Sequence, residues 1–343
     1  MKNVLIEASI ESLKKTIRLK PNYADAHCSL GVLYAKTGDY QKAIECFKEA
    51  IRIKPDLADT HCNLGRIYGK IGDNPKAIEC LKEAIRIKPD NADAYYGLGL
   101  LYDKTPAQPG CSGGGDNQKA IECYKEAIRL KPDNAIAHYN LGVAYWKTGD
   151  YQKEMECYKE AIRLKPDYAL AHCSLGFAYM KTGDNQKAIE CLKEATRLDP
   201  NDDEMLCNLG RIYGEAGDYQ KAIECFEKTI RLKPAHAEAH NNLGFMYGKI
   251  GEHQKAIECY NEAIYIEPDL AIAHFNLGVA YEQTGEAKRS PEELRGDNQK
   301  AMECFKEAIR IQPDYAEARD KLGELEGIKQ PRNNRDSVAT TQD

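Results

Sequence analysis

Six histidines that could bind a metal recur in similar sequence surroundings along the chain, and three of them are followed directly by cysteine. The six are His27, His61, His138, His172, His240 and His274. Their geometry opposes a metal site, because adjacent residues of a helix diverge by about 100° around its axis. Equivalent residues of packed helices lie roughly 8–10 Å apart or more, too far for tetrahedral ligation through ~2 Å bonds. We therefore expect neutral histidines that pack in the core, with no metal and no other cofactor.

Thirteen cysteines could form disulfides, yet their placement is repetitive. Eight share one position, Cys46, Cys80, Cys123, Cys157, Cys191, Cys225, Cys259 and Cys304; four share another, Cys28, Cys62, Cys173 and Cys207; Cys111 stands alone. No CxxC pair occurs. Cysteine used in this way behaves as a small buried hydrophobe, which fits a reducing compartment. The sequence thus predicts free thiols in a cytoplasmic protein.

The composition argues against several classes of function. The 343 residues are 42% hydrophobic and 30% charged, with a net charge of −6. No apolar run approaches the ~18 residues of a membrane span, and the acidic balance argues against a nucleic-acid partner. No phosphate-binding loop, nucleophile motif or carboxylate pair stands out. We therefore expect a protein that is not an enzyme and that binds neither nucleic acid nor membrane.

Prolines mark an internal repeat of 34 residues. They stand at Pro21, Pro55, Pro89, Pro132, Pro166, Pro200, Pro234, Pro268 and Pro313, and insertions at 106–114 and 285–295 lengthen two intervals. The eight repeats at 24–315 start at 24, 58, 92, 135, 169, 203, 237 and 271, and positions 1–14 show helical spacing of apolar and small residues. Gly-Asp, or Gly-Glu once, at positions 15–16 ends this helix and caps the next. Positions 17–31 predict a second, amphipathic helix, which proline at position 32 stops.

The ends of the chain depart from the repeat. Residues 1–23 align with a second helix only, which is half a repeat. Residues 316–330 have the pattern of a lone first helix with a polar face, as a C-terminal capping helix needs. Residues 331–343 are polar, and we expect them to be disordered. The half repeat is either a helical cap or the mark of a chain trimmed from a longer parent.

The repeated pattern L-G-x-x-Y…A-x-x-x-[FLY]…A…P, seen first at Leu30, Gly31 and Tyr34, resembles the tetratricopeptide repeat family over nearly the whole chain. Glu154 and Thr229 each replace one of its alanines, and histidine usually replaces the family's aromatic residue at position 4. The resemblance implies an all-α fold, a right-handed α-solenoid, or superhelix, of helix–turn–helix repeats. It also implies that the first helix of each repeat lines the concave side, with positions 2, 5, 6, 9, 12 and 13 facing inward.

Asparagine recurs at inward position 6, as Asn63, Asn140, Asn208, Asn242 and Asn276. An amide offers both a donor and an acceptor, so one in each repeat could hold the backbone of an extended peptide. The row resembles the asparagine ladder in the repeat domain of O-linked N-acetylglucosamine transferase. The alternative is asparagine that bonds its own helix backbone or a neighbouring turn, although asparagine is a poor residue in mid-helix.

Charged and aromatic side chains accompany this row on the predicted inner face. Lysine stands at position 13 as Lys36, Lys70, Lys104, Lys147, Lys181 and Lys249. Such a row suits an acidic segment, but lysine at a helix C-terminus also complements the helix dipole. Aromatic binding anchors are predicted at Tyr139, Trp146, Phe177 and Phe275, and packing between neighbouring first helices is the alternative.

The residues at positions 5 and 9 narrow the choice of partner. A carboxylate clamp for chaperone tails needs lysine at position 5 and asparagine at position 9, and no repeat has that pair. The leading hypothesis is a non-enzymatic scaffold that binds an extended protein or peptide segment in the concave groove. One alternative is a homo-oligomer that assembles through the half repeat. Another is the targeting array of a larger transferase-like enzyme whose catalytic part is absent from this chain.

Overall fold

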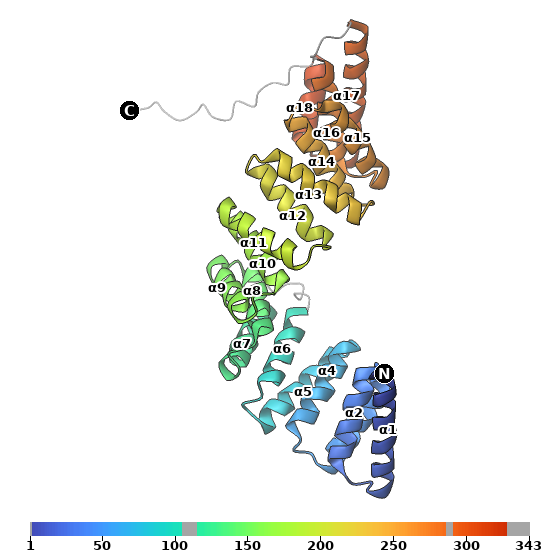
Figure 1. Ribbon diagram of the computed structural model, residues 1–343, viewed down its shortest axis with the longest axis vertical. Coiled ribbons are helices and arrows are strands. Elements are labelled where there is room, and N and C mark those ends of the chain that lie inside the picture. Colours follow the sequence, from blue (N-terminus) through green and yellow to red (C-terminus); the bar gives the residue numbers. More distant parts are fainter. Residues whose placement is uncertain (1, 105–114, 286–290, 328–343) are drawn as a thin grey trace, which may run out of the picture. The chain divides into compact units, whose positions relative to one another are not determined.

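The fold was examined in a computed structural model, which describes residues 2–104, 115–285 and 291–327. Within these ranges the chain forms eighteen α-helices and no β-strand (Figure 1). The first insertion (106–114), residues 286–290 of the second, and the C-terminal tail predicted to be disordered (331–343) lie outside the described residues.

Helices come in pairs, one pair to each repeat. The first of each pair, termed the A helix, is α2 (Ala24–Thr37), α4 (Ala58–Lys70), α6 (Ala92–Lys104), α8 (Ala135–Thr148), α10 (Ala169–Lys181), α12 (Asp203–Glu215), α14 (Ala237–Lys249) or α16 (Ala271–Gly285). The second, the B helix, is α3 (Tyr40–Ile53), α5 (Asn74–Ile87), α7 (Gly115–Leu130), α9 (Tyr151–Leu164), α11 (Asn185–Leu198), α13 (Tyr219–Leu232), α15 (His253–Ile266) or α17 (Pro291–Ile311). Helix α1 (Lys2–Leu19) precedes the pairs and α18 (Ala316–Leu325) follows them. The predicted all-α fold of helix–turn–helix repeats is confirmed.

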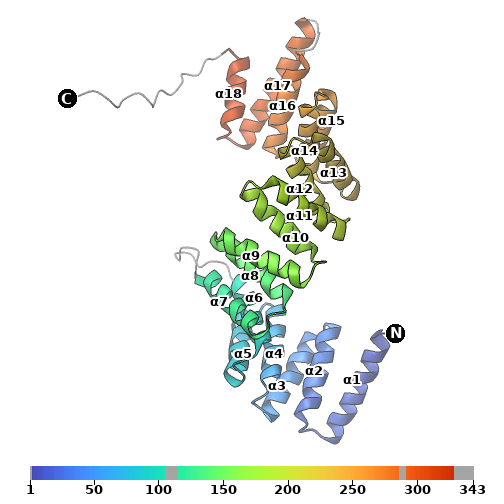
Figure 2. The same ribbon diagram turned by 60° about the vertical axis from the view of Figure 1, so that its left-hand side comes forward.

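The chain divides into two compact units, Met1–Ala178 and Tyr179–Asp343, and the boundary falls within α10. Inside each unit, consecutive helices pack against one another, from α1 to α9 in the first unit and from α11 to α18 in the second (Figure 2). Each unit therefore builds its core from contacts between sequence neighbours, as repeat proteins do.

The small residues of the repeat let the two helices of a pair approach closely. A Cβ atom added to Gly142 in α8 would lie 2.6 Å from a ring carbon of Tyr158 in α9. At position 20 the alanines are completely buried, Ala43 and Ala77 among them. Glu154 takes this alanine's place in one repeat and is buried as well. The glycine and alanine of the pattern are thus explained by helix packing.

Removal of one hydroxyl group is expected to stabilise the core. Tyr124 is completely buried, and its hydroxyl has no hydrogen-bond partner among the residues that the structure describes; the equivalent residue is phenylalanine in three other repeats, at Phe47, Phe226 and Phe305. Burying an unpaired hydroxyl costs free energy, so Tyr124→Phe should raise the free energy of unfolding by about 1 kcal/mol in urea denaturation. The control is Tyr158→Phe, because the Tyr158 hydroxyl has the polar Ser174 hydroxyl beside it. Equal effects of the two substitutions would contradict this account.

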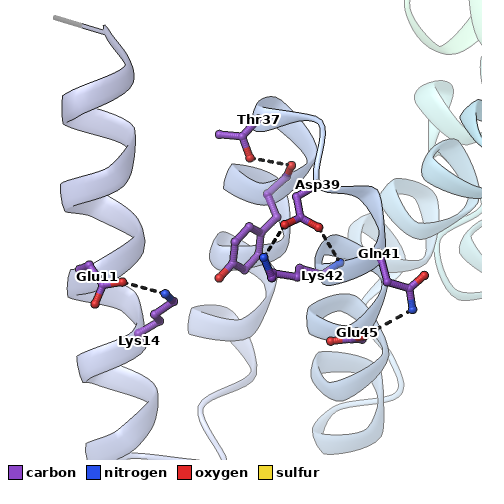
Figure 3. Close-up of polar contacts among 8 residues, drawn as sticks. Glu11, Lys14, Thr37, Asp39, Gln41, Lys42 and Glu45 are labelled. Atoms are coloured by element: carbon purple, nitrogen blue, oxygen red, sulfur yellow. Dashed lines mark hydrogen bonds and ion pairs between the residues drawn. The ribbon is translucent and has the colours of Figure 1, made fainter.

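The turn between the two helices of a pair uses the predicted Gly-Asp. Gly38 has a φ of 83°, a conformation that other residues rarely adopt. The Asp39 carboxylate then caps α3, since it accepts a hydrogen bond from the Lys42 backbone N–H at 3.3 Å (Figure 3). The Lys42 ammonium lies 2.6 Å from the other carboxylate oxygen. This arrangement recurs at four further turns, with Asp73, Asp150, Asp184 and Asp218.

These capping aspartates make the fold sensitive to acid. The neighbouring lysine lowers the pKa of all five carboxyl groups, Asp39, Asp73, Asp150, Asp184 and Asp218. A group with a lowered pKa in the folded state stabilises it fully above its unfolded pKa, about 3.9 for aspartate, and less as the pH falls through the folded value. The melting temperature from circular dichroism should therefore drop steeply below about pH 4.

Asparagine caps helices without titrating. Changing all five aspartates to asparagine should flatten this acid dependence while the helices remain capped. An equally steep decline in the asparagine variant would show that other groups cause it.

The six repeated histidines do not pack in the core, contrary to the prediction. They are half-buried. The His138 Nε2 atom lies 3.0 Å from the carbonyl oxygen of Pro132, and the other five make the same contact at 2.9–3.0 Å with the proline six residues earlier. Because a carbonyl only accepts, Nε2–H is the donor. The histidine therefore fastens each A helix to the turn before it.

Candidate functional site

The A helices form one face of each unit. In the first unit α2 contacts α4 and α4 contacts α6; in the second, α12 contacts α14 and α14 contacts α16. We call the open surface of these helices the A face. All fifteen residues that the sequence proposed as binding contacts belong to A helices.

The asparagine row joins neighbouring repeats across this face. In the first unit, the Asn140 amide donates to the Tyr96 hydroxyl at 2.8 Å. In the second, the Asn276 amide donates to the Asn241 side-chain oxygen at 3.0 Å, and the Asn241 amide donates to Asn242 at 3.3 Å. Both inter-repeat bonds run from position 6 of one repeat to position 5 of the repeat before it. This structural use differs from both interpretations offered by the sequence.

The remaining members of the row have different surroundings. The Asn242 amide nitrogen is buried, and the Cys207 thiol is a polar neighbour of it among the described residues. Asn208 is half-buried. Asn63 is half-buried too and lines a pocket on the A face. Binding of peptide backbone by these asparagines remains a prediction. Asn63 is best placed for it, because its side chain lines a pocket.

Two of the four predicted aromatic anchors belong to the packing between helices. The Tyr139 ring lies 5.6 Å from the ring of Tyr158 in the B helix of the same repeat and 5.1 Å from that of Tyr168, just before the next A helix. Phe275 is held in the same way in the second unit, at 5.7 and 5.1 Å from two rings. Such tilted pairs stabilise a core, so the alternative of packing describes these two residues.

The other two aromatic candidates differ in exposure. Trp146 in α8 is 47% exposed, whereas Phe177 in α10 is half-buried. Ile136 and Leu170, at position 2 of the same two repeats, are 49% and 50% exposed. Large apolar side chains therefore lie open on this part of the A face.

The lysine row is not uniform. The Lys147 ammonium lies 2.8 Å from the Asp103 carboxylate and 3.1 Å from the Asp103 carbonyl oxygen, so its charge is neutralised. Lys249 covers the ring of Phe245 at 4.9 Å. Lys181 is exposed. Lys36, Lys70 and Lys104, the first three of the row, line pockets on the A face of the first unit.

One of these pockets, the Gly97 pocket, has a volume of about 380 Å³. Its apolar wall consists of Leu81, Leu100, Leu101 and Ile136, and its charged rim consists of Arg66, Lys70, Lys104 and Asp93. The space exists because Gly97 stands where five repeats have asparagine, and Gly69 also lacks a side chain. A Cβ atom on Gly97 would approach Leu81 to 3.1 Å.

The second pocket, the Asn63 pocket, has a volume of about 520 Å³ and lies between α2 and α4. Val32, Lys36, Tyr40 and Asn63 line it. Arg66 and Lys70 line both pockets, which therefore adjoin. Together the pockets form a trough on the A face from α2 to the start of α8.

The cations of this trough differ from those of the B helices. On the B helices the lysine of the first turn and the arginine of the last turn are commonly paired with an acid three residues earlier, as in Asp39–Lys42 at 2.6 Å and Glu49–Arg52 at 2.7 Å. Lys36, Arg66, Lys70 and Lys104 form no ion pair with any residue that the structure describes, although Lys70 lies 5.7 Å from the Tyr40 ring centre. The trough therefore carries positive charge that is available to a ligand.

The sequence analysis missed Arg66, Gly97 and Leu100 as site residues. The repeat positions contained the signal: position 9 is apolar in six repeats but arginine at Arg66 and Arg211, and position 6 is asparagine in five repeats but glycine at Gly97. A break in a repeated pattern at an inward position marks a local site better than the repeated residue itself.

The described residues give little support for metal binding, thiol chemistry or a membrane-spanning helix. Among the described residues no group of three or more histidine, cysteine or acidic side chains is arranged to hold a metal. Burial raises the pKa of the B-helix thiols to about 11 for Cys46, Cys80, Cys123, Cys225, Cys259 and Cys304, which makes them poor nucleophiles at neutral pH. Of the helices that the structure describes, none combines the length and apolar character needed to cross a membrane.

Solved structures share this fold. The TPR protein YrrB, which has an unusual peptide-binding site, is 24% identical, covers 57% of this chain and 96% of its own, and superposes with a TM-score of 0.50. MamA is 28% identical over 54% of this chain and 96% of its own, with a TM-score of 0.46. The Cut9–Hcn1 hetero-tetramer of the APC/C is 20% identical over 86% of this chain and 55% of its own, with a TM-score of 0.52. No curated protein matched the chain.

Family models match most of the sequence. The model described as TPR repeat matches residues 6–38, 65–105, 114–149, 148–183 and 246–285. Models described as tetratricopeptide repeat match 24–57, 167–235, 225–258 and 293–315. The first of these models alone covers more than half of the chain, which therefore belongs to the tetratricopeptide repeat family of protein-interaction repeats.

Proposed function

We propose that this chain is a non-enzymatic scaffold that binds an extended protein segment along the A face of its first unit, from α2 to α8. The observation that carries this proposal is the trough in which the Asn63 and Gly97 pockets adjoin at Arg66 and Lys70. A trough that crosses several repeats suits a chain in extended conformation, because each repeat adds one similar subsite.

The side chains of the trough can serve both parts of a peptide. The amide of Asn63 offers a donor and an acceptor to peptide backbone. Asn140 lies beyond the two pocket linings, in α8; it uses one amide hydrogen for Tyr96, which leaves its second hydrogen and its carbonyl oxygen. The apolar wall can contact apolar side chains of a partner, and the unpaired cations can pair with its acidic side chains. Neither pocket lining contains a histidine, a cysteine or a pair of carboxylates, which supports binding rather than catalysis.

A peptide-display selection tests this proposal. The full chain and the variant Arg66→Glu/Lys70→Glu would each be presented to the same library of random twelve-residue peptides. We expect enriched sequences with the wild-type chain and their loss with the variant. The control variant, Lys82→Glu/Arg86→Glu, makes the same charge change beside a pocket on the B-helix side of the same unit. Equal enrichment by all three proteins would overturn the proposal.

A further inference from the structure

The positive side chains of the trough form a short row with regular spacing. Lys36, Lys70 and Lys104 occupy the same position in three consecutive repeats, and Arg66 adds a fourth charge between the two pockets. Among the described residues that line the two pockets, Asp93 is the one acid. The linings therefore hold an excess of three positive charges, four cations against one acid.

The row ends at the third repeat. In the fourth repeat the equivalent Lys147 is neutralised by Asp103 at 2.8 Å. Ile136 and Trp146 are large apolar side chains of α8 that are exposed there. The cations that line the two pockets are thus confined to α2, α4 and α6, and exposed apolar side chains follow in α8.

The Gly97 pocket places apolar surface directly beside these charges. Leu81, Leu100 and Ile136 line it, and Arg66 and Lys104 stand at its rim. A volume of about 380 Å³ falls within the range of pockets that enclose a ligand group, roughly 300–1,000 Å³. An apolar side chain would fit the Gly97 pocket better than a polar one, because the wall inside the charged rim is formed by leucine and isoleucine side chains.

The spacing of the row sets the spacing of its ligand. Neighbouring A helices in contact are roughly 8–10 Å apart, and an extended chain advances about 3.3–3.6 Å for each residue. One repeat therefore corresponds to about three residues of an extended peptide. Three lysines in consecutive repeats would then face the first, fourth and seventh residues of a segment about seven residues long.

We infer that the partner is an acidic segment of about seven extended residues, with a carboxylate at every third residue and a leucine-sized apolar side chain between two of them that enters the Gly97 pocket. This inference rests on the proposed function and names the chemistry of its ligand. The carboxylates approach Lys36, Lys70 and Lys104, while Arg66 lies between the two pockets.

Fluorescence anisotropy with synthetic peptides tests the inference on the full chain. The probe is fluorescein-labelled Glu-Ser-Leu-Glu-Ser-Leu-Glu, which offers an apolar residue between its acids in either orientation. We expect it to bind at least about 10-fold more tightly than the version with serine for leucine. The version with lysine for glutamate should not bind. A version of the same composition with its three glutamates adjacent should bind more weakly, and equal binding would overturn the spacing.

Two variants connect the leucine preference to the pocket. Ile136→Ser removes part of the wall at a side chain that is 49% exposed, so the fold should tolerate it. Gly97→Asn fills the pocket with the residue that five other repeats carry there. Each should reduce the leucine-to-serine difference to less than about 3-fold while the preference for glutamate over lysine persists. A leucine preference that both folded variants retain would overturn the assignment to this pocket.

The results separate this inference from the function on which it rests. If display yields peptides that depend on Arg66 and Lys70 but are neither acidic nor apolar, the inference is wrong and the binding site stands. If display yields no peptide that depends on these residues, the proposed function itself is wrong.

Discussion

Replacing Phe226 with alanine is expected to lower the free energy of unfolding by about 3–5 kcal/mol, as is usual for a fully buried ring. Phe226 has no exposed surface and fills the space between α12 and α13 that Gly210 leaves open. A Cβ atom on Gly210 would lie 2.9 Å from this ring, so the two residues are matched in shape. Because stability in a repeat protein is a sum over repeats and their interfaces, the loss should appear as earlier urea unfolding of the second unit.

Phe245→Ala is the matched control for this prediction. Phe245 belongs to the next A helix, but it is 43% exposed and covered by Lys249 rather than by core residues. Its removal should change the free energy of unfolding by no more than about 1 kcal/mol. Similar losses in the two variants would contradict the assignment of position 24 to the core and position 9 to the A face.

Reversing two charges is expected to have the largest effect on binding. Arg66→Glu/Lys70→Glu changes the charge of the trough by four units, at the place where the two pockets adjoin. A charge pair at about 4 Å contributes roughly 1 kcal/mol even in water and more near a protein surface. Affinity for a peptide selected by display should therefore fall at least about 100-fold, as measured by isothermal titration calorimetry. Raising the salt concentration should weaken binding to the wild-type chain much more than to the variant.

The variant must remain folded for this result to be informative. Arg66 and Lys70 are exposed and form no ion pair with a described residue, so the melting temperature should change little. Lys82→Glu/Arg86→Glu provides a second reference with the same net charge but an intact trough. Equal loss of affinity in both variants would mean that binding depends on total charge and not on the trough.

The fold could be predicted from the sequence because one pattern recurs eight times. The prolines, the Gly-Asp turns and the leucine, glycine and tyrosine of the A helices each constrain a short segment, and the contacts that follow are between sequence neighbours. The histidines show where this reasoning failed. The sequence predicted a core residue because histidine takes the place of an aromatic residue of the family pattern. In the structure the His138 ring donates a hydrogen bond to the Pro132 carbonyl oxygen, six residues earlier.

The candidate site could be predicted only in part. Helical spacing placed the lysines and asparagines on the A face, but it could not show which of them already have partners. The Lys147–Asp103 pair and the Asn140–Tyr96 hydrogen bond each join residues 44 positions apart, across an insertion. Such pairs depend on how neighbouring A helices are placed. The pocket at Gly97 likewise depends on Leu81 and Ile136, which come from other repeats.

Photo-crosslinking tests the central claim most directly, because it locates a bound peptide without altering the trough. A peptide selected by display would carry a benzophenone group at each position in turn, and the crosslinked residues would be identified by mass spectrometry. The account predicts crosslinks within α2, α4, α6 and the first turn of α8, shifting from Lys36 toward Ile136 or in the opposite direction as the group moves along the peptide. Crosslinks concentrated on the B helices α3 and α5 would contradict it.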